Sequence, residues 1–248
     1  MQNICIIVPC YNEEHRMPTG EFIKYAESGK SLSFCFVNDG SKDQTHDILA
    51  QLQQKCGSGI YVINLPENRG KAEAVRTGIT EMLKTDKFDI LGYLDADLAT
   101  PVEEIFLLYD HLMSDESYLL SFGSRIKRIG TDIKRKSYRH YFGRVFSTCA
   151  SLMLRLPVYD TQCGAKLFKK EIASKIFSEK FLSRWLFDVE IFARITNMYG
   201  IEKAKKIMIE VPLTKWHDKG DSRITLMHMI KVPFELCKIK RKYKLQKP

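Results

Sequence analysis

The segment LGYLDADLAT, residues 91–100, joins a short apolar run to two aspartates that stand one residue apart, Asp95 and Asp97. An apolar run of this length next to polar residues is typical of a buried strand. The two carboxylates permit two interpretations. They hold a metal ion, or they mark where the strand meets solvent, with Asp97 capping a helix that begins near Pro101. Taken alone the pair favours the second interpretation, so the rest of the chain decides between them.

The first hundred residues alternate apolar, strand-like runs with helix-like segments. The predicted strands and the helices that follow them are CIIVP and 20–29, FCFVN and 43–55, IYVINL and 70–84, and FDILGYL and 101–113. Such alternation predicts an α/β fold with a Rossmann-like, mainly parallel sheet flanked by helices.

Each of these strands runs directly into a polar cluster. The clusters are residues 9–14, 38–43, 66–71 and 95–101. The ligand crevice of an open α/β sheet lies outside the carboxyl ends of its strands. We therefore expect the four clusters to converge on one site.

The second half is less regular and shows no repeat, linker or clear domain boundary. Its predicted elements are a fifth strand YLLSFGSR, a basic helical stretch over about 134–155, a turn DTQCG, a helix containing WLFDVEIFARI, a strand IMIEVPL and a loop WHDKGDSR. We expect residues 1–223 to form a single catalytic domain and residues 224–248 a basic amphipathic tail.

Composition limits the class of protein. A chain of 248 residues with 44% hydrophobic residues has the size of one globular domain. Its seven cysteines are odd in number and form no CxxC pair, which indicates neither a disulfide framework nor a zinc ribbon and fits a reducing cytoplasm. The N-terminus resembles no secretion signal, and no apolar run reaches the ~18 residues of a spanning helix.

The net charge of +9 is concentrated in two places. Residues 121–155 hold nine Lys or Arg against one acid, and residues 237–248 hold six and no acid. Such blocks suit phosphate-rich partners, which are nucleic acids, phosphorylated ligands or an anionic membrane surface.

The common nucleotide-binding loops are absent from the sequence. A Walker A loop requires glycine five residues before Gly70, where this chain has Leu65, and the turn after the first strand, PCYNEE, contains no glycine. The strand ends instead bring together three acids, Asp39, Asp95 and Asp97. Three anions at one edge need a compensating cation, and carboxylate oxygens suit Mg²⁺ or Mn²⁺.

Eight motifs in order together resemble an inverting family 2 glycosyltransferase of GT-A fold, over nearly the whole chain. They are VPCYNEE (8–14), VNDGSKDQT (37–45), ENRGKAEAVRTG (67–78), DADLAT (95–100), GSR (123–125), DTQCGAKLF (160–168), RWLFDVE (184–190) and GDSR (220–223). Within the family, DTQCG followed by RWxFDVE most resembles the dolichyl-phosphate β-glucosyltransferases and related bacterial polyprenyl-phosphate glycosyltransferases.

The resemblance implies a nucleotide-sugar site at the strand ends. Asp95 and Asp97 match the metal motif of the family, and Asp97 is also counted among the catalytic residues. A third ligand found in some relatives is replaced by Ala99, so the metal should rely on diphosphate and water as well. The residues implied in nucleotide-sugar binding are Pro9, Tyr11, Glu13, Asp39, Arg69, Gly70, Lys71, Asp95, Ala96 and Asp97.

The acceptor side is implied by the later motifs. A lipid phosphate is already anionic and needs cations around it, whereas a sugar hydroxyl needs a base, for which Asp188 is the candidate. Asp188 and Glu190 stand two apart on a predicted helix, so only one should face the reaction, and we favour Asp188. Asp188, Asp97 and Arg125 are the predicted catalytic residues. The acceptor or phosphate contacts are expected from Arg125, Arg139, Arg144, Gln162 and Arg223.

The predicted function is metal-dependent transfer of a hexose, glucose from UDP-glucose, to a polyprenyl phosphate such as dolichyl or undecaprenyl phosphate. Two alternatives keep the fold: transfer to a glycan hydroxyl, and GDP-mannose as the donor. A module that only binds nucleic acid is disfavoured, because acidic strand ends would repel a phosphate backbone in the crevice.

The expected location is cytoplasmic and peripheral on the membrane. The segment ITLMHMIKVPFELCKIKRKYKLQ mixes apolar and basic residues in the manner of an interfacial helix. At about 1 kcal/mol for each basic residue near an anionic leaflet, its charge favours peripheral contact. A chain truncated before spanning helices would have the same sequence, so this alternative stays open.

Overall fold

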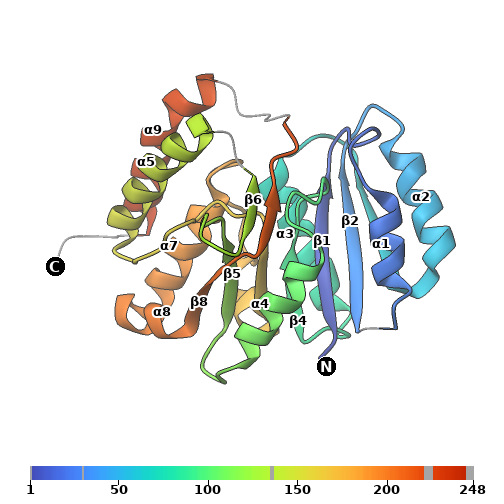
Figure 1. Cartoon of the computed structure of the whole chain (residues 1–248), viewed down its shortest axis with the longest axis horizontal. Helices are drawn as coiled ribbons and strands as arrows, with labels where there is room; N and C mark the ends of the chain where they lie inside the picture. The colour runs from blue at the N-terminus through green and yellow to red at the C-terminus, as the bar shows by residue number, and fades with distance from the viewer. Residues whose placement is uncertain (1, 30, 135–136, 221–225, 244–248) are drawn as a thin grey trace.

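The computed structural model describes residues 2–29, 31–134, 137–220 and 226–243, and their side chains except those of 137–142 and 226–231 (Figure 1). The main sheet contains β1 (Ile4–Cys10), β2 (Leu32–Asp39), β3 (Ile60–Leu65), β4 (Ile90–Tyr93), β5 (Leu120–Ser124), β7 (Lys166–Lys169) and β8 (Met208–Pro212). A small parallel pair consists of β6 (Asp132–Lys134) and β9 (Lys215–His217).

The helices follow the predicted alternation in the first half. They are α1 (Thr19–Ala26), α2 (Thr45–Cys56), the 3-10 helix η1 (Gly57–Gly59), α3 (Lys71–Lys84), α4 (Glu103–Met113), α5 (Ser137–Leu154), α6 (Lys170–Ile176), α7 (Phe187–Tyr199), α8 (Ile201–Ile207) and α9 (Leu226–Lys242).

The strand order of the main sheet is β3-β2-β1-β4-β7-β5-β8. The pairs β3–β2, β2–β1, β1–β4 and β5–β8 are parallel, whereas β7 runs antiparallel to both of its neighbours. The predicted mainly parallel α/β sheet is therefore confirmed. Since β1, β2 and β4 are adjacent and parallel, the polar segments that follow them emerge at one edge.

Each face of the sheet carries its own hydrophobic core, as alternating strand side chains require. In β1, Ile4, Ile6 and Val8 belong to the core shared with α1, α2 and α4. Cys5 and Ile7 belong to the core shared with α3, α6 and α7. Figure 1 shows α1 and α2 at one end of the molecule and α5, α8 and α9 at the other.

The strand β7 is the main element that the sequence did not predict. It follows the DTQCG turn, where a loop leading into a helix was expected, and it lies between β4 and β5. Its first residue, Lys166, is fully buried and pairs across the strands with Tyr93, the last residue of β4.

Helix α9 packs on the domain through one side. Leu236, Ile239 and the adjacent Tyr243 are buried in the same core as α7. Four basic residues of the expected tail, Lys238, Lys240, Arg241 and Lys242, are exposed on a helix that is part of the folded body. Residues 244–248 lie outside the described part of the chain.

Candidate functional site

The DxD carboxylates follow β4 and each faces a cation. Lys71 Nζ lies 2.5 Å from Asp95 Oδ1, and Arg16 Nη2 lies 2.9 Å from Asp97 Oδ2. Burial and the neighbouring charge of Asp95 raise the pKa of Asp97. The intervening Ala96 is buried and so fixes the turn from the inside. The pair is thus an acidic site whose charge is compensated from two sides.

Gly164, in the DTQCG turn, lies directly against Asp95. A Cβ at this position would lie 2.6 Å from Asp95 Cγ and closer still to Oδ2. Any larger side chain would therefore have to displace the carboxylate. The turn and the DxD motif, about 70 residues apart in sequence, form one packed unit.

Asp39, at the end of β2, organises the loop before α3. Its Oδ1 accepts a hydrogen bond from the backbone N–H of Arg69 at 2.7 Å, and its Oδ2 accepts one from Gly70 at 2.8 Å. Burial raises the pKa of Asp39, although these two donors act in the opposite direction. Gly40 adopts φ +64° where its missing Cβ would meet the backbone of Glu67 at 2.5 Å.

The first polar cluster continues from β1. Pro9 lies in β1 beside Val37 of β2, and Tyr11 follows it in a half-buried position. Glu13 is buried, and its backbone N–H donates to Thr45 Oγ1 at 2.8 Å. These residues lie at the same sheet edge as Asp39, as expected because β1 and β2 are parallel.

Lys71 links this edge to Asp188. Burial would lower the pKa of Lys71, but the carboxylates of Asp95 and Asp188 outweigh it and raise the pKa. The Lys71 ammonium also lies 5.8 Å from the ring centroids of Tyr93 and Phe187. The structure therefore brings the predicted metal pair and the predicted catalytic carboxylate close enough to influence the same lysine.

Asp188 lies in the first turn of α7 and is buried. Its Oδ1 accepts hydrogen bonds from the Tyr93 hydroxyl and from Lys166 Nζ, the latter at 2.6 Å. Burial, followed by the charge of Asp188, raises the pKa of Tyr93 well above its ordinary value, so this hydroxyl acts as a donor.

Glu190, two residues further along α7, has a different environment. It is fully buried and accepts hydrogen bonds from Arg194 Nη2 at 3.0 Å, the Tyr243 hydroxyl at 2.7 Å and the backbone N–H of Leu182 at 2.8 Å. The two carboxylates thus belong to separate networks, and only that of Asp188 includes residues of the strand ends.

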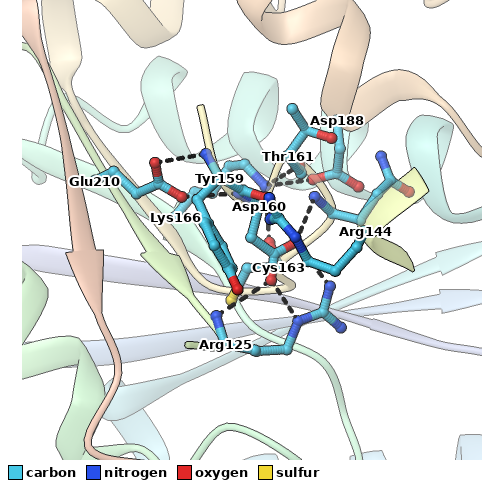
Figure 2. A network of polar contacts seen from close by, with 10 residues as sticks. Arg125, Arg144, Tyr159, Asp160, Thr161, Cys163, Lys166, Asp188 and Glu210 are labelled. Atoms are coloured by element: carbon cyan, nitrogen blue, oxygen red, sulfur yellow. Dashed lines mark hydrogen bonds and ion pairs between the residues drawn. The ribbon is translucent and has the colours of Figure 1, made fainter. Parts of the chain in front are cut away.

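The 159–163 turn is held from both sides, as Figure 2 shows. Arg125 binds Asp160 through two parallel contacts, Nε to Oδ2 at 2.6 Å and Nη2 to Oδ1 at 2.8 Å. Glu210 of β8 accepts the backbone N–H groups of Tyr159 and Asp160, both at 2.8 Å. Burial raises the pKa of Glu210.

The remaining predicted acceptor residues lie in different situations. Arg144 Nη1 donates to the carbonyl of Tyr159 at 2.8 Å and lies over its ring, and Gln162 is half-buried in the turn. Arg125 uses its fork on Asp160, and its contact with the acceptor phosphate stays a prediction. The Arg139 side chain and all of Arg223 lie outside the described residues.

Cys163, in the same turn, is fully buried. Burial, and then the charge of Asp160, raise the pKa of its thiol to about 11. A thiol with such a pKa carries little thiolate at neutral pH.

Four residues of the site received no role from the sequence: Arg16, Tyr93, Lys166 and Glu210. Lys166 lies within the quoted motif DTQCGAKLF, which was the available signal for it. Arg16, Tyr93 and Glu210 contact residues that are far away in the sequence, and only the folded structure brings these partners to them.

Solved structures share the fold of this chain. The crystal structure of glucosyl-3-phosphoglycerate synthase from Mycobacterium tuberculosis matches the chain with a TM-score of 0.69 at 16% identity, covering 98% of this chain and 80% of that chain. A complex of that synthase with Mn²⁺, UDP and glucosyl-3-phosphoglycerate gives a TM-score of 0.68 at 15% identity, with 98% and 80% coverage. The fold is that of the GT-A glycosyltransferases.

The family follows from the sequence match. Glycosyl transferase family 2 matches residues 5–177, and the chain belongs to this family of glycosyltransferases. A dolichyl-phosphate beta-glucosyltransferase of Trichomonas vaginalis is 30% identical over 247 residues, which cover 95% of this chain and 72% of the relative. The Homo sapiens dolichyl-phosphate beta-glucosyltransferase is 34% identical over 204 residues, covering 77% and 62%.

Proposed function

We propose that the protein transfers glucose from UDP-glucose to a polyprenyl phosphate. The observation that carries the proposal is the cluster around Lys71, which binds Asp95 of the DxD pair and whose pKa is raised by Asp95 and Asp188. It supports a donor site and a reaction centre that adjoin each other. The relatives named dolichyl-phosphate beta-glucosyltransferase, at 27% to 34% identity, support the sugar and the acceptor.

Asp95 and Asp97 are the proposed ligands of Mg²⁺ or Mn²⁺. Their hard carboxylate oxygens suit either ion. Among the residues that the structure describes, no three or more His, Cys, Asp or Glu side chains form a group that could hold a metal ion. When bound, such an ion neutralises charge on the leaving diphosphate. Pro9, Tyr11, Glu13 and Asp39 are proposed to bind the nucleoside, and residues 69–71 to border the diphosphate.

Asp188 and the 159–163 turn are proposed to form the acceptor side. An inverting transfer requires the attacking oxygen in line with the leaving group, on the opposite face of the sugar. An ionised lipid phosphate attacks without losing a proton, so the protein's task is to place it. Gln162 belongs to the turn, and Arg125 and Arg144 bind Asp160 and the Tyr159 carbonyl within it. These three residues are the candidates for that task.

The test is incubation of the protein with radiolabelled UDP-glucose, Mn²⁺ and polyprenyl phosphate. We expect label in an organic-extractable product that mild acid releases. Label that stays only in an aqueous glycan fraction would contradict the lipid acceptor. A thermal-shift series of UDP- and GDP-sugars with and without Mn²⁺ tests the donor, because binding to the native state raises stability. A larger shift with GDP-mannose would contradict UDP-glucose.

A glycan hydroxyl is the second candidate acceptor, and one observation favours it. The Oδ2 atom of Asp188 receives no hydrogen bond from any residue that the structure describes, which leaves it able to accept a proton. A sugar hydroxyl would require such a base, whereas a phosphate would not.

The Asp188→Asn variant distinguishes the two acceptors. With a polyprenyl phosphate we expect kcat to fall about tenfold, because no base is needed and only the placement that the Asp188–Lys166 pair provides is lost. With a hydroxyl acceptor the loss of the base should cost about 10³-fold. The measurement is kcat on both acceptors with one preparation, and equal losses on both would contradict a base role confined to hydroxyls.

We also propose that α5 and α9 contact an anionic membrane. Val145 and Leu152 on α5 and Phe234 on α9 are 65%, 74% and 75% exposed, and the two helices lie side by side (Figure 1). Lys238 and Arg241 add exposed positive charge on α9. Within the described ranges, no helix combines the length and apolar character needed to cross a membrane.

The Phe234→Glu variant tests this contact. It removes an exposed ring and adds a charge that anionic lipid repels, so vesicle binding should weaken about tenfold or more. Sedimentation with vesicles of anionic phospholipid measures it. The control is Met113→Glu, which makes a similar change at an exposed residue of α4 and should bind normally. Equal binding by Phe234→Glu and the unchanged protein would refute the contact.

A further inference from the structure

Lys166 is a buried cation that the proposed reaction does not yet use. Its side chain is fully buried, and it is the only lysine in the described part of the chain that is buried. Its ammonium donates to the carbonyl of Thr161 at 3.1 Å, the carbonyl of Cys163 at 2.7 Å and Asp188 Oδ1 at 2.6 Å. All three of its donors are therefore satisfied, in fixed directions.

The strand pairing in the sheet directs the Lys166 side chain towards Asp188. Lys166 and Tyr93 are directly opposite on the antiparallel strands β7 and β4, so their side chains leave the sheet on the same face. Both donate to the same oxygen, Oδ1, of Asp188. The result is a carboxylate anchored by one oxygen to two strands, with Oδ2 left for the reaction.

The same ammonium also holds the turn that borders the metal motif. It binds the carbonyls of Thr161 and Cys163. Both belong to the DTQCG turn, whose last residue, Gly164, packs against Asp95. A shift of this ammonium would therefore move the Asp188 carboxylate relative to the donor site.

We propose that Lys166 is a positioning residue that, together with Tyr93, holds the Asp188 carboxylate in its reactive place and orientation. The inference rests on the proposed role of Asp188 in transfer. A buried ion pair need not stabilise a fold, since its desolvation offsets its attraction. Placement of a reacting group, by contrast, changes rates strongly, and an error of about 1 Å can cost about 10²-fold.

The chain offers a matched control on the same helix. Glu190 of α7 is also buried, and it also binds a buried cation, Arg194, and a tyrosine hydroxyl, that of Tyr243. Each network therefore joins one carboxylate, one cation and one tyrosine hydroxyl. If both cations had a purely structural role, Lys166→Met and Arg194→Met should have similar effects on activity and stability. Only the network of Lys166 faces the strand ends, so a role in the reaction predicts a larger loss of activity from Lys166→Met.

The experiment compares the two variants by release of UDP from UDP-glucose, which any transfer from this donor produces. We expect Lys166→Met to lower kcat at least tenfold while its KM for UDP-glucose stays within about threefold. Arg194→Met should lower the melting temperature at least as much and keep kcat within about threefold. The proposal is overturned if Lys166→Met keeps kcat within threefold, or if both variants lose kcat equally.

A second comparison stays decisive even if Lys166→Met alone does not fold. The double variant Asp188→Asn, Lys166→Met removes both members of the pair and leaves no uncompensated buried charge. If Lys166 acts through Asp188, the double variant should match Asp188→Asn in kcat within about threefold. Losses that multiply would refute the proposal. The absence of an organic-extractable product from the unchanged protein would refute the lipid acceptor alone, since the same comparison with a glycan hydroxyl as acceptor still reports on Lys166 through UDP release.

Discussion

The Asp97→Asn protein is expected to lose transfer activity by at least about 100-fold while it melts at or above the temperature of the unchanged protein. The loss follows because an amide is a poor ligand for the ion that Asp97 is proposed to hold, and such an ion contributes several kcal/mol. The stability follows because burial and Asp95 raise the pKa of Asp97, so its ionised form is unfavourable in the metal-free fold.

The pH dependence of melting checks this explanation. An acid whose pKa is higher in the folded than in the unfolded state reduces stability as pH rises above about 4, the ordinary value. The unchanged, metal-free protein should lose stability in this way as pH rises, whereas Asp97→Asn should not. The difference in melting temperature between the two proteins should therefore grow from pH 4 towards neutrality. Asp110→Asn, at an exposed site on α4, is the control and should keep full activity. Full activity of Asp97→Asn without added metal would contradict the assignment.

The convergence of the acidic residues could be predicted from the sequence because it depends only on parallel strands. Asp39 and the DxD pair follow strands of one direction, and the carboxyl ends of such strands share an edge. The predicted helices of the first half likewise differ from α1 to α4 by only a few residues at their ends, since helix periodicity and strand alternation are local signals.

The centre of the acceptor side could not be predicted from the same signals. The strand β7 has four residues, two of them lysines, so no local pattern marks it as a buried strand. Burial of Lys166 becomes possible only with a counter-charge, and Asp188 lies 22 residues later. Arg125 likewise pairs with Asp160, 35 residues away in the sequence. These pairings are fixed by tertiary structure and not by spacing.

Gly164→Ala is expected to reduce transfer by about 100-fold while the protein remains folded. The added Cβ would lie 2.6 Å from Asp95 Cγ and closer to Oδ2, so the carboxylate must move. The backbone of Gly164 has no positive φ, so alanine brings a steric effect without backbone strain. Because the Asp95 side chain is 40% exposed, it can swing outwards, and we expect the overpacking to cost about 1–3 kcal/mol. Its outward movement breaks the contact with Lys71 and separates Asp95 from Asp97.

The dependence on Mn²⁺ separates a displaced ligand from a damaged fold. We expect the Mn²⁺ concentration for half-maximal activity to rise at least tenfold in Gly164→Ala, and excess Mn²⁺ to restore part of kcat by mass action. Gly20→Ala is the control, because nothing lies within 4 Å of a Cβ there, and it should keep both activity and Mn²⁺ dependence. An unchanged Mn²⁺ requirement in Gly164→Ala would place Asp95 outside the metal site. A loss of activity that no Mn²⁺ concentration relieves, together with a lower melting temperature, would assign the glycine to folding.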